Sequence, residues 1–412
     1  MLEHHRDLVR ATVPVLKEQG EAITNAFYRD LFQTHPELYN IFNPANQRDG
    51  GQARSLAASI LSYAAHIDHL DQLGGMVERI AHKHASLEVQ PEHYPIVGKH
   101  LLGAIRTVLG EAATPEILEA WSAAYQQLAT IMIGREQEIY DQNAAQPGGW
   151  SGFKPFIVQR KTRESAVMTS FYLAPEDNQP LPSFRPGQYL SLRLKVPGTK
   201  YSGIRQYSLS HVPDSGFYRI SVKRETGPLH DPQAPAGLIS NYLHDQVKEG
   251  DKLLVHVPQG DFALDETSTR PVVLLSAGSG ITPAFCMLQR LALEGTRRVL
   301  FVHATTERAH HAFEKDVRAI ATKDPNVDVA IYYEHVDDSD VHGTHYDEIG
   351  RISADSLAPY LPDEEADYYY CGPVGFLNAV DRILDQFHIP LARRFSEAFA
   401  PDPSFETELA TA

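Results

Sequence analysis

The chain has 412 residues, 42% of them hydrophobic and 22% charged, and its formal net charge is −16. At roughly 100–200 residues per domain, this length predicts two or three domains with hydrophobic cores. The acidic charge argues against a nucleic-acid-binding protein, because phosphates would be repelled. The two cysteines, Cys286 and Cys371, exclude a disulfide framework and any metal site built only from cysteines.

The sequence contains no run of about 18 apolar residues, the shortest length typical of a transmembrane helix. The N-terminal stretch MLEHHRDLVR also lacks the apolar core of a signal peptide. We therefore expect a cytoplasmic protein without a membrane span, and we expect it to be a monomer.

Residues 1–146 are predicted to form an all-α domain. Apolar positions recur there at spacings of three and four, as in Ile23, Phe27 and Leu31. Glycine and proline residues between 143 and 156 mark the end of this domain. Breaks between its helices are expected at Pro36, at residues 43–51, near Pro91 and Pro95, and at residues 110–116.

Residues 151–263 are predicted to form a small antiparallel β-barrel of six strands. In GQYLSLRLKV (187–196), every second residue is apolar, and the same alternation returns in later stretches that are separated by turn signals. A strand that buries one face and exposes the other has this period of two. Short alternating strands of this kind are typical of a barrel.

Residues 268–412 are predicted to form a doubly wound α/β domain. The apolar runs PVVLLSA (271–277), RRVLFVHA (297–304), DVAIYYEHV (328–336) and ADYYYCGP (366–373) are separated by helical segments. Continuous apolar strands that alternate with helices indicate a parallel sheet covered on both faces.

Two segments of the predicted barrel region carry groups that suit a dinucleotide. In IRQYSLS (204–210), Arg205 and Tyr207 project from the same face of an extended strand. A guanidinium suits a diphosphate, and an aromatic ring suits the face of a planar cofactor. Farther along, Ser240 and Asn241 open a predicted helix whose free N–H groups could hold a phosphate.

Two further segments lie at the ends of predicted parallel strands. SAGSGITP (276–283) follows a buried strand and opens a helix, and its glycines permit close approach of the backbone to a pyrophosphate. Because it is not a G-x-G-x-x-G motif, a plain dehydrogenase is disfavoured. Residues 371–373 end another strand, at the edge where open α/β sheets bind ligands.

In this order, the segments resemble the ferredoxin–NADP reductase superfamily over residues 155–412. The resemblance implies that the first group of residues binds FAD and the second binds NAD(P)H. The FAD-binding residues would be Tyr189, Arg205, Gln206, Tyr207, Ser208, Ser240 and Asn241. The NAD(P)H-binding residues would be Gly278, Ser279, Gly280, Ile281, Thr282, Pro283, Cys371, Gly372 and Pro373. For Cys371, a small buried residue at a strand end is an equally good interpretation.

The helical stretch GGMVERIAHKHASLEV (74–89) contains two histidines with different orientations. Met76, Ile80, His84 and Leu87 share one apolar helix face, so His84 is predicted to point inward. His82 lies about 200° around the helix from Ile80 and is predicted to face water. A single inward histidine is more often a core residue than a ligand, so the pattern alone leaves its role open.

The stretch NAFYRDLFQTHPELYNIFNPANQRDGGQ (25–52) looks like the globin segment that runs from the second helix to the start of the distal helix. His84 follows Gln52 by 32 residues, a separation similar to that of the two haem-facing positions in globins. The chain as a whole therefore resembles a flavohaemoglobin, with globin, FAD and NAD(P) domains in that order.

This resemblance implies a haem b group whose iron is bound by His84, with Tyr94 and Glu136 behind that histidine. A carboxylate that accepts the imidazole N–H makes the ligand more electron-donating, which favours activation of O₂ over storage. On pattern alone, Glu138 could serve in place of Glu136. Three further residues would lie on the side where O₂ binds, with Tyr28 donating a hydrogen bond to it: Tyr28, Phe42 and Gln52.

The resemblance also implies a contact between the two halves of the chain. Lys83 matches a lysine that is expected to meet Glu397 near the flavin, although a solvated lysine is the alternative interpretation. The C-terminal residues expected at the flavin are Glu397, Ala398, Phe399, Ala400 and Pro401. Ala400 stands where the family commonly has glycine.

The implied activity is that of a nitric oxide dioxygenase, in which NAD(P)H supplies electrons through FAD to haem and NO is oxidised to nitrate. The first alternative is a haem-based reductase of NO or alkyl hydroperoxides at low oxygen. A non-catalytic O₂ or NO sensor is the second, and it is disfavoured because no output domain is apparent. The choice between NADH and NADPH stays open, because Arg308 could bind the 2′-phosphate of NADPH whereas the neighbouring Glu307 favours NADH.

Overall fold

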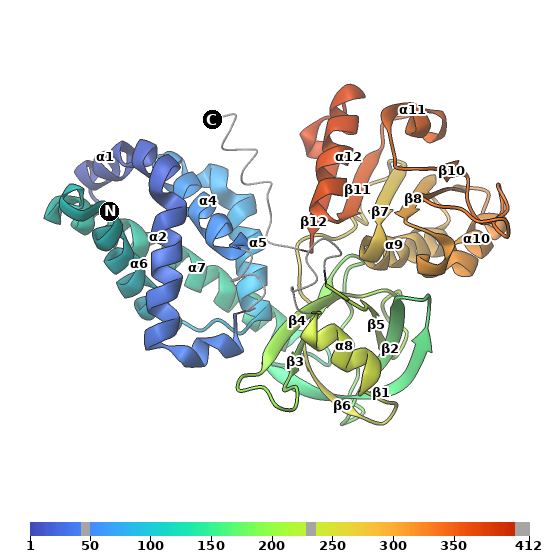
Figure 1. Ribbon diagram of the computed structural model, residues 1–412, viewed down its shortest axis with the longest axis horizontal. Coiled ribbons are helices and arrows are strands. Elements are labelled where there is room, and N and C mark those ends of the chain that lie inside the picture. Colours follow the sequence, from blue (N-terminus) through green and yellow to red (C-terminus); the bar gives the residue numbers. More distant parts are fainter. Residues whose placement is uncertain (43–49, 228–235, 400–412) are drawn as a thin grey trace.

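The computed structural model describes residues 1–42, 50–227 and 236–399. Figure 1 shows a helical N-terminal region, a central β-barrel and a C-terminal α/β region. None of the helices in these described ranges is both long enough and apolar enough to cross a membrane.

The N-terminal region is helical, as predicted. Proline and glycine delimit its helices. Helix α2 ends at Thr34, two residues before Pro36, and Gly110 follows α6 with a φ of 55°. The described elements are α1 (Glu3–Ala11), α2 (Val13–Thr34), η1 (Pro36–Asn40), α4 (Gly51–Ala65), η2 (Leu70–Leu73), α5 (Gly74–Ser86), α6 (His93–Leu109), η3 (Gly110–Ala112) and α7 (Pro115–Ala145).

The helix break expected near Pro91 and Pro95 is confirmed, and the next helix begins between the two prolines. Helix α6 begins at His93, so Pro95 lies in its first turn. Proline is tolerated there because the first backbone N–H groups of a helix have no partner within the helix. The breaks expected at Pro36 and at residues 110–116 are also confirmed, whereas most of residues 43–51 lie outside the described ranges.

The helical region contains two apolar clusters. The larger one is centred on α2, whose Ile23, Phe27 and Leu31 are buried at the spacing that the sequence predicted. The smaller one lies between α5 and α7, where Ala81 and Ala85 are fully buried. Alanine at these positions allows α5 to lie close to α7, the helix that carries Glu136.

The central region is the predicted six-stranded antiparallel barrel. Its strand order is β4-β3-β6-β1-β2-β5, and an antiparallel bridge between Leu209 and Ile220 joins the two ends of the sheet. The elements are β1 (Phe153–Arg163), β2 (Met168–Pro175), β3 (Tyr189–Leu194), β4 (Gly203–Ser208), β5 (Tyr218–Lys223), α8 (Leu238–Asp245) and β6 (Lys252–His256).

The C-terminal region contains a parallel sheet with the order β10-β9-β8-β7-β11-β12. Its elements are β7 (Val272–Ala277), η4 (Gly278–Gly280), α9 (Ile281–Glu294), β8 (Val299–Thr305), η5 (Arg308–His310), α10 (Glu314–Lys323), β9 (Val327–Tyr333), β10 (Glu348–Ile349), α11 (Ala354–Leu357), η6 (Ala358–Tyr360), β11 (Asp367–Gly372), α12 (Val374–Gln386), η7 (Leu391–Arg393) and β12 (Arg394–Ala398).

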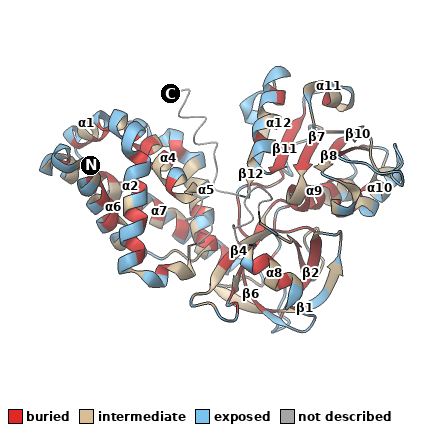
Figure 2. Cartoon of the chain, viewed as in Figure 1, coloured by how far each residue is buried: buried red, intermediate tan, exposed pale blue. Residues whose placement is uncertain are grey.

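Helices cover both faces of this sheet, as the apolar strands predicted. Val272 and Leu274 pack in a cluster with α9 and α10, whereas Val273 and Leu275 pack in a cluster with α11 and α12. Figure 2 shows the central strands as buried between these two layers. The sheet is therefore doubly wound.

The strand order changes direction at the carboxyl ends of β7 and β11. From β7 the chain continues to β8 on one side, and it later returns to β11 on the other side. In open α/β sheets, ligands bind at such a switch point, beside the loops that follow the two strands. Those loops begin at Gly278 and Pro373, the segments that the sequence predicted as a nucleotide site.

Candidate haem and flavin sites

The His84 imidazole is held by a buried carboxylate from another helix. Nδ1 of His84 lies 2.7 Å from Oε1 of Glu136, to which the Tyr94 hydroxyl also donates a hydrogen bond of 2.5 Å. Glu136 is only 2% exposed, whereas Glu138 is exposed and lies 2.8 Å from Arg135. The structure therefore places Glu136, and not Glu138, against His84.

This arrangement determines which imidazole nitrogen can bind a metal. Because Nδ1 donates to a carboxylate, Nε2 is the atom with a lone pair available for coordination. Burial, together with the charge of Glu136, raises the pKa of Tyr94, so its hydroxyl keeps its proton and remains a donor. The His84 side chain is 33% exposed, although its Nδ1 contacts the buried Glu136.

A metal at His84 would need other ligands that the protein does not supply. Across the described ranges, no group of three or more histidine, cysteine or carboxylate side chains could hold a metal ion. Haem meets this requirement, since the porphyrin brings four nitrogen ligands and needs only one axial histidine. The donor set at His84 therefore fits haem.

Tyr28, Phe42 and Gln52 are also brought together, from three different segments. The Tyr28 and Phe42 rings are 5.9 Å apart and nearly perpendicular, and the Tyr28 hydroxyl hydrogen-bonds the Gln52 side chain. Burial raises the pKa of Tyr28, although the bond to Gln52 opposes this. The phenol therefore stays protonated at neutral pH and can donate a hydrogen bond.

The predicted FAD residues on β3 and β4 lie next to one another. Tyr189 pairs with Ser208 across the two strands, and burial raises the pKa of its hydroxyl. Of the residues that the structure describes, only Ile204 receives a hydrogen bond from Arg205, at 2.8 Å. The remaining N–H groups of that guanidinium are therefore available to a diphosphate.

Ser240 and Asn241 lie in the first turn of α8, and their side chains bond to the protein. The Ser240 hydroxyl donates to the Gly237 carbonyl at 3.0 Å, and the Asn241 amide donates to the Glu225 carbonyl at 2.8 Å. The expectation of a free N–H is wrong for Asn241, whose backbone N–H also bonds Gly237. Because α8 begins at Leu238, the free N–H groups belong to the three residues before Asn241.

The loop after β7 packs directly on the end of β11. Gly278 has φ 54°, and Gly280 is buried against the backbone of Cys371. The side chains of Ile281 and Pro283 are buried in the core, so these residues can offer only backbone atoms to a nucleotide. The Thr282 hydroxyl donates to the Ser279 carbonyl at 3.0 Å, which braces the loop.

At the end of β11, Cys371 is buried and Pro373 precedes the first residue of α12. Burial raises the pKa of the Cys371 thiol well above its ordinary value, so it is not a thiolate. Strand β12 then pairs with β11, placing Glu397 opposite Cys371 and Ala398 opposite Gly372.

Phe399 is 48% exposed at the end of this segment, and Ala400 and Pro401 lie outside the described residues. Desolvation lowers the pKa of Lys83 to about 8. The negative charge of Glu397, across the domain boundary, opposes this decrease, and the positive charge of Arg205 adds to it. Although water reaches the Lys83 side chain, its ammonium group donates a hydrogen bond to Gln206.

Helix α5 meets the barrel through a polar stripe formed by Arg79, His82, Lys83 and Ser86. These residues are spaced by three, one and three positions, so they share one helix face. Figure 1 shows α5 on the side of the helical region nearest the barrel. Their partners on the barrel are Asp261 for Arg79, Gln259 for His82, and Gln206 for both Lys83 and Ser86.

The prediction that His82 faces water is wrong. Its Nδ1 lies 3.0 Å from Oε1 of Gln259 on the barrel, and its Nε2 lies 3.1 Å from Oε1 of Glu78. Polar neighbours suggested solvent, but a polar helix face can equally pair with polar groups of another domain. Ser86 and Gln259 were missed for the same reason, and the spacing of the stripe was the available signal.

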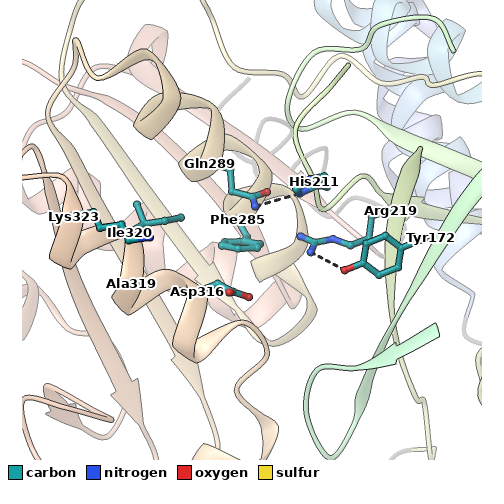
Figure 3. A pocket seen from close by; sticks show the side chains of 9 residues that line it. All are labelled: Tyr172, His211, Arg219, Phe285, Gln289, Asp316, Ala319, Ile320 and Lys323. Atoms are coloured by element: carbon teal, nitrogen blue, oxygen red, sulfur yellow. Dashed lines mark hydrogen bonds between the residues drawn. The ribbon is translucent and has the colours of Figure 1, made fainter. Parts of the chain in front are cut away.

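A separate cavity of about 360 Å³ lies between the barrel and helices α9 and α10 (Figure 3). The buried Arg219 lines it, donating to the Ser210 carbonyl while its guanidinium lies 4.9 Å from the centre of the Phe313 ring. Burial, together with Arg219, lowers the pKa of the nearby His211 to about 4. These contacts join the barrel to the α/β region, and the sequence did not predict them.

Comparison with known proteins agrees with this organisation. Three family models match in succession: Globin over residues 25–132, Oxidoreductase FAD-binding domain over 155–264 and Oxidoreductase NAD-binding domain over 274–382. A flavohemoprotein of Deinococcus radiodurans is 57% identical over 399 residues, covering 97% of this chain and 96% of the relative. The chain belongs to the flavohemoprotein family.

Other flavohemoproteins are similar over their full lengths. That of Bordetella pertussis is 49% identical, covering 96% of this chain and 97% of the relative. The crystal structure of flavohemoglobin from Malassezia yamatoensis, with bound FAD and haem, has a TM-score of 0.84 and 29% identity, covering 97% and 99% of the two chains. The FAD/NAD-binding domain of nitric oxide dioxygenase from Vibrio cholerae has a TM-score of 0.54 and 35% identity, covering 61% of this chain and all of that domain.

Proposed function

We propose that this flavohemoprotein is a nitric oxide dioxygenase that uses haem b, FAD and NAD(P)H. Its reaction combines NO, O₂ and one electron to give nitrate, and so removes NO. The observation that carries this proposal is the buried Glu136 carboxylate on Nδ1 of His84. That contact makes the imidazole a stronger electron donor, which O₂ activation requires and storage does not.

The proposed roles follow from the contacts of each side chain. His84 would hold the iron through Nε2, and Glu136 and Tyr94 orient the imidazole ring. Tyr28, kept protonated by burial, would donate a hydrogen bond to a diatomic molecule bound at the haem. Gln52 orients the Tyr28 hydroxyl, and Phe42 packs beside it.

In the reductase half, Tyr189 and residues 205–208 hold FAD, and the first turn of α8 contributes N–H groups. The loop 278–283 and residues 371–373 would bind NAD(P)H. Glu397, Ala398 and Phe399, which lie beside residues 371–373, would face the flavin. When bound, the flavin would convert a two-electron donor into single-electron steps for the haem. The contact of α5 with the barrel keeps the two sites adjacent.

The experiment uses the full chain loaded with haem and FAD. Absorbance must show a haem Soret band together with flavin bands, and NADH and NADPH are compared as donors. The expected result is NO consumption that requires O₂ and yields one nitrate per NO. NADH oxidation without nitrate overturns the proposal. NO or peroxide reduction without O₂, as the only activity, supports the reductase instead.

We also propose that the protein is a cytoplasmic monomer. Sedimentation of the loaded protein should give the mass of one chain at micromolar concentration. A mass of two chains that persists on dilution contradicts this.

A further inference from the structure

Ser86 lies at the point where the haem-side helix meets the barrel. It is 0% exposed, and it follows His84 by two positions on α5, which is about 200° around the helix. His84 therefore points into the helical region, whereas Ser86 points to the barrel. About half a turn of helix connects the proposed iron ligand to the proposed flavin site.

The Ser86 hydroxyl is hydrogen-bonded on two sides. It donates its proton to the Lys83 carbonyl at 2.8 Å and accepts the Gln206 side-chain N–H at 2.6 Å.

Gln206 completes a closed ring of hydrogen bonds. Its Oε1 accepts from the Lys83 ammonium group, while its Nε2 donates to Ser86. The opposite amide orientation would place the Gln206 NH₂ group against the Lys83 donor, so the observed orientation is the favourable one. The ring joins a side chain of β4 to the backbone carbonyl next to His84.

We propose that Ser86 is a positioning residue that couples occupancy of the flavin site to the orientation of His84. The proposal rests on the assignment of His84 to haem and of Gln206 to FAD. Because Ser86 bonds both the Gln206 side chain and the Lys83 carbonyl, the two are fixed together. A ligand that moves Gln206 therefore changes how His84 meets Glu136.

The test uses the full chain loaded with haem only, to which FAD is added. The iron–histidine stretching frequency of the ferrous haem, measured by resonance Raman spectroscopy, reports on His84 independently of turnover. In the unaltered chain, FAD shifts this frequency. In Ser86→Ala the shift is lost and FAD binds roughly tenfold more weakly, because the variant lacks the one buried hydrogen bond to Gln206 of the barrel. Ser86→Thr, which keeps the hydroxyl, restores the shift.

Glu88→Gln is the matched control, because Glu88 pairs with Arg193 of the barrel at 2.6 Å just beyond α5. This substitution removes an ion pair between the same two domains but leaves the hydrogen bonds among Ser86, Lys83 and Gln206 intact. The FAD-dependent shift in the iron–histidine frequency is therefore expected to be retained. If Ser86→Ala does not fold, Gln206→Met removes the same bond from the barrel side and is expected to reduce the shift.

A shift of unaltered size in Ser86→Ala, or in Gln206→Met where that variant replaces it, overturns the coupling. An equal loss of the shift in Glu88→Gln overturns it as well. An unaltered chain that binds both cofactors without any shift also overturns it and leaves the proposed function standing. A chain that binds no haem or no FAD contradicts the proposed function instead.

Discussion

A Cβ atom placed on Gly280 would lie 1.9 Å from the carbonyl oxygen of Cys371. The obstacle is backbone in the interior of a parallel sheet, so it cannot move aside. The glycine is therefore required by contact between two segments that are 91 positions apart. Those segments follow or end the neighbouring strands β7 and β11, which the sheet brings together.

Gly280→Ala should push the loop 278–283 away from β11 and slow flavin reduction by NADH. A displacement of about 1 Å can cost roughly 100-fold in rate. Stopped-flow absorbance of the flavin measures this directly. Gly375→Ala is the control, since a Cβ there meets nothing within 4 Å. Equal rates in both variants would contradict the packing argument.

His84→Ala should abolish haem binding and leave the reductase half intact. The histidine is the single protein ligand proposed for the iron, and no other metal-ligand cluster is found within the described ranges. The Soret band should disappear, while NADH-driven reduction of an artificial dye through FAD continues. Haem retained at the unaltered level would show that another residue binds it.

Glu136→Gln should retain haem but lower the iron–histidine stretching frequency, because a neutral amide accepts the imidazole N–H less strongly than a carboxylate. Turnover of NO is expected to fall about 10- to 100-fold, the usual cost of losing such a partner. Glu138→Gln is the matched control on the same helix. The assignment fails if both variants behave alike.

Tyr28→Phe should make O₂ leave the ferrous haem roughly tenfold faster. The change removes one buried hydrogen bond and keeps the ring that packs against Phe42. Flash photolysis or stopped-flow mixing measures the dissociation rate. Tyr63→Phe removes a hydroxyl that donates to the Ala124 carbonyl, so it should lower stability and leave O₂ dissociation unaltered.

Unfolding should depend on pH through His303. Burial lowers the pKa of His303 to about 3, against an ordinary value of 6.5. Between these two values the unfolded chain binds a proton that the folded chain does not, so stability falls as the pH falls. The slope for this one group is at most about 1.4 kcal/mol per pH unit, and it vanishes above the ordinary pKa.

His303→Asn removes this titration, so urea unfolding of the variant should depend less steeply on pH between about 6.5 and 3 than that of the unaltered chain. Above that range the two pH profiles should run parallel. Profiles that stay parallel throughout would show that His303 does not titrate as its burial requires.

Helical periodicity was sufficient to predict that His84 points inward, because an apolar face needs no knowledge of its partner. The same reasoning failed for His82, since a polar face is compatible with water and with another polar surface. The pairing of Lys83 with Gln206 spans 123 positions, and no local pattern encodes it. Strand alternation and the loops after β7 and β11 were predictable because both follow from local composition.

The stripe on α5 also limits how this helix can vary in length. Arg79, His82, Lys83 and Ser86 share one face only while the number of residues between them is unchanged. Inserting or deleting one residue between His84 and Ser86 would turn the rest of the helix by about 100° and carry the hydroxyl away from Gln206. Homologous chains can therefore differ in length before Arg79 or after Glu88, but not within these two turns.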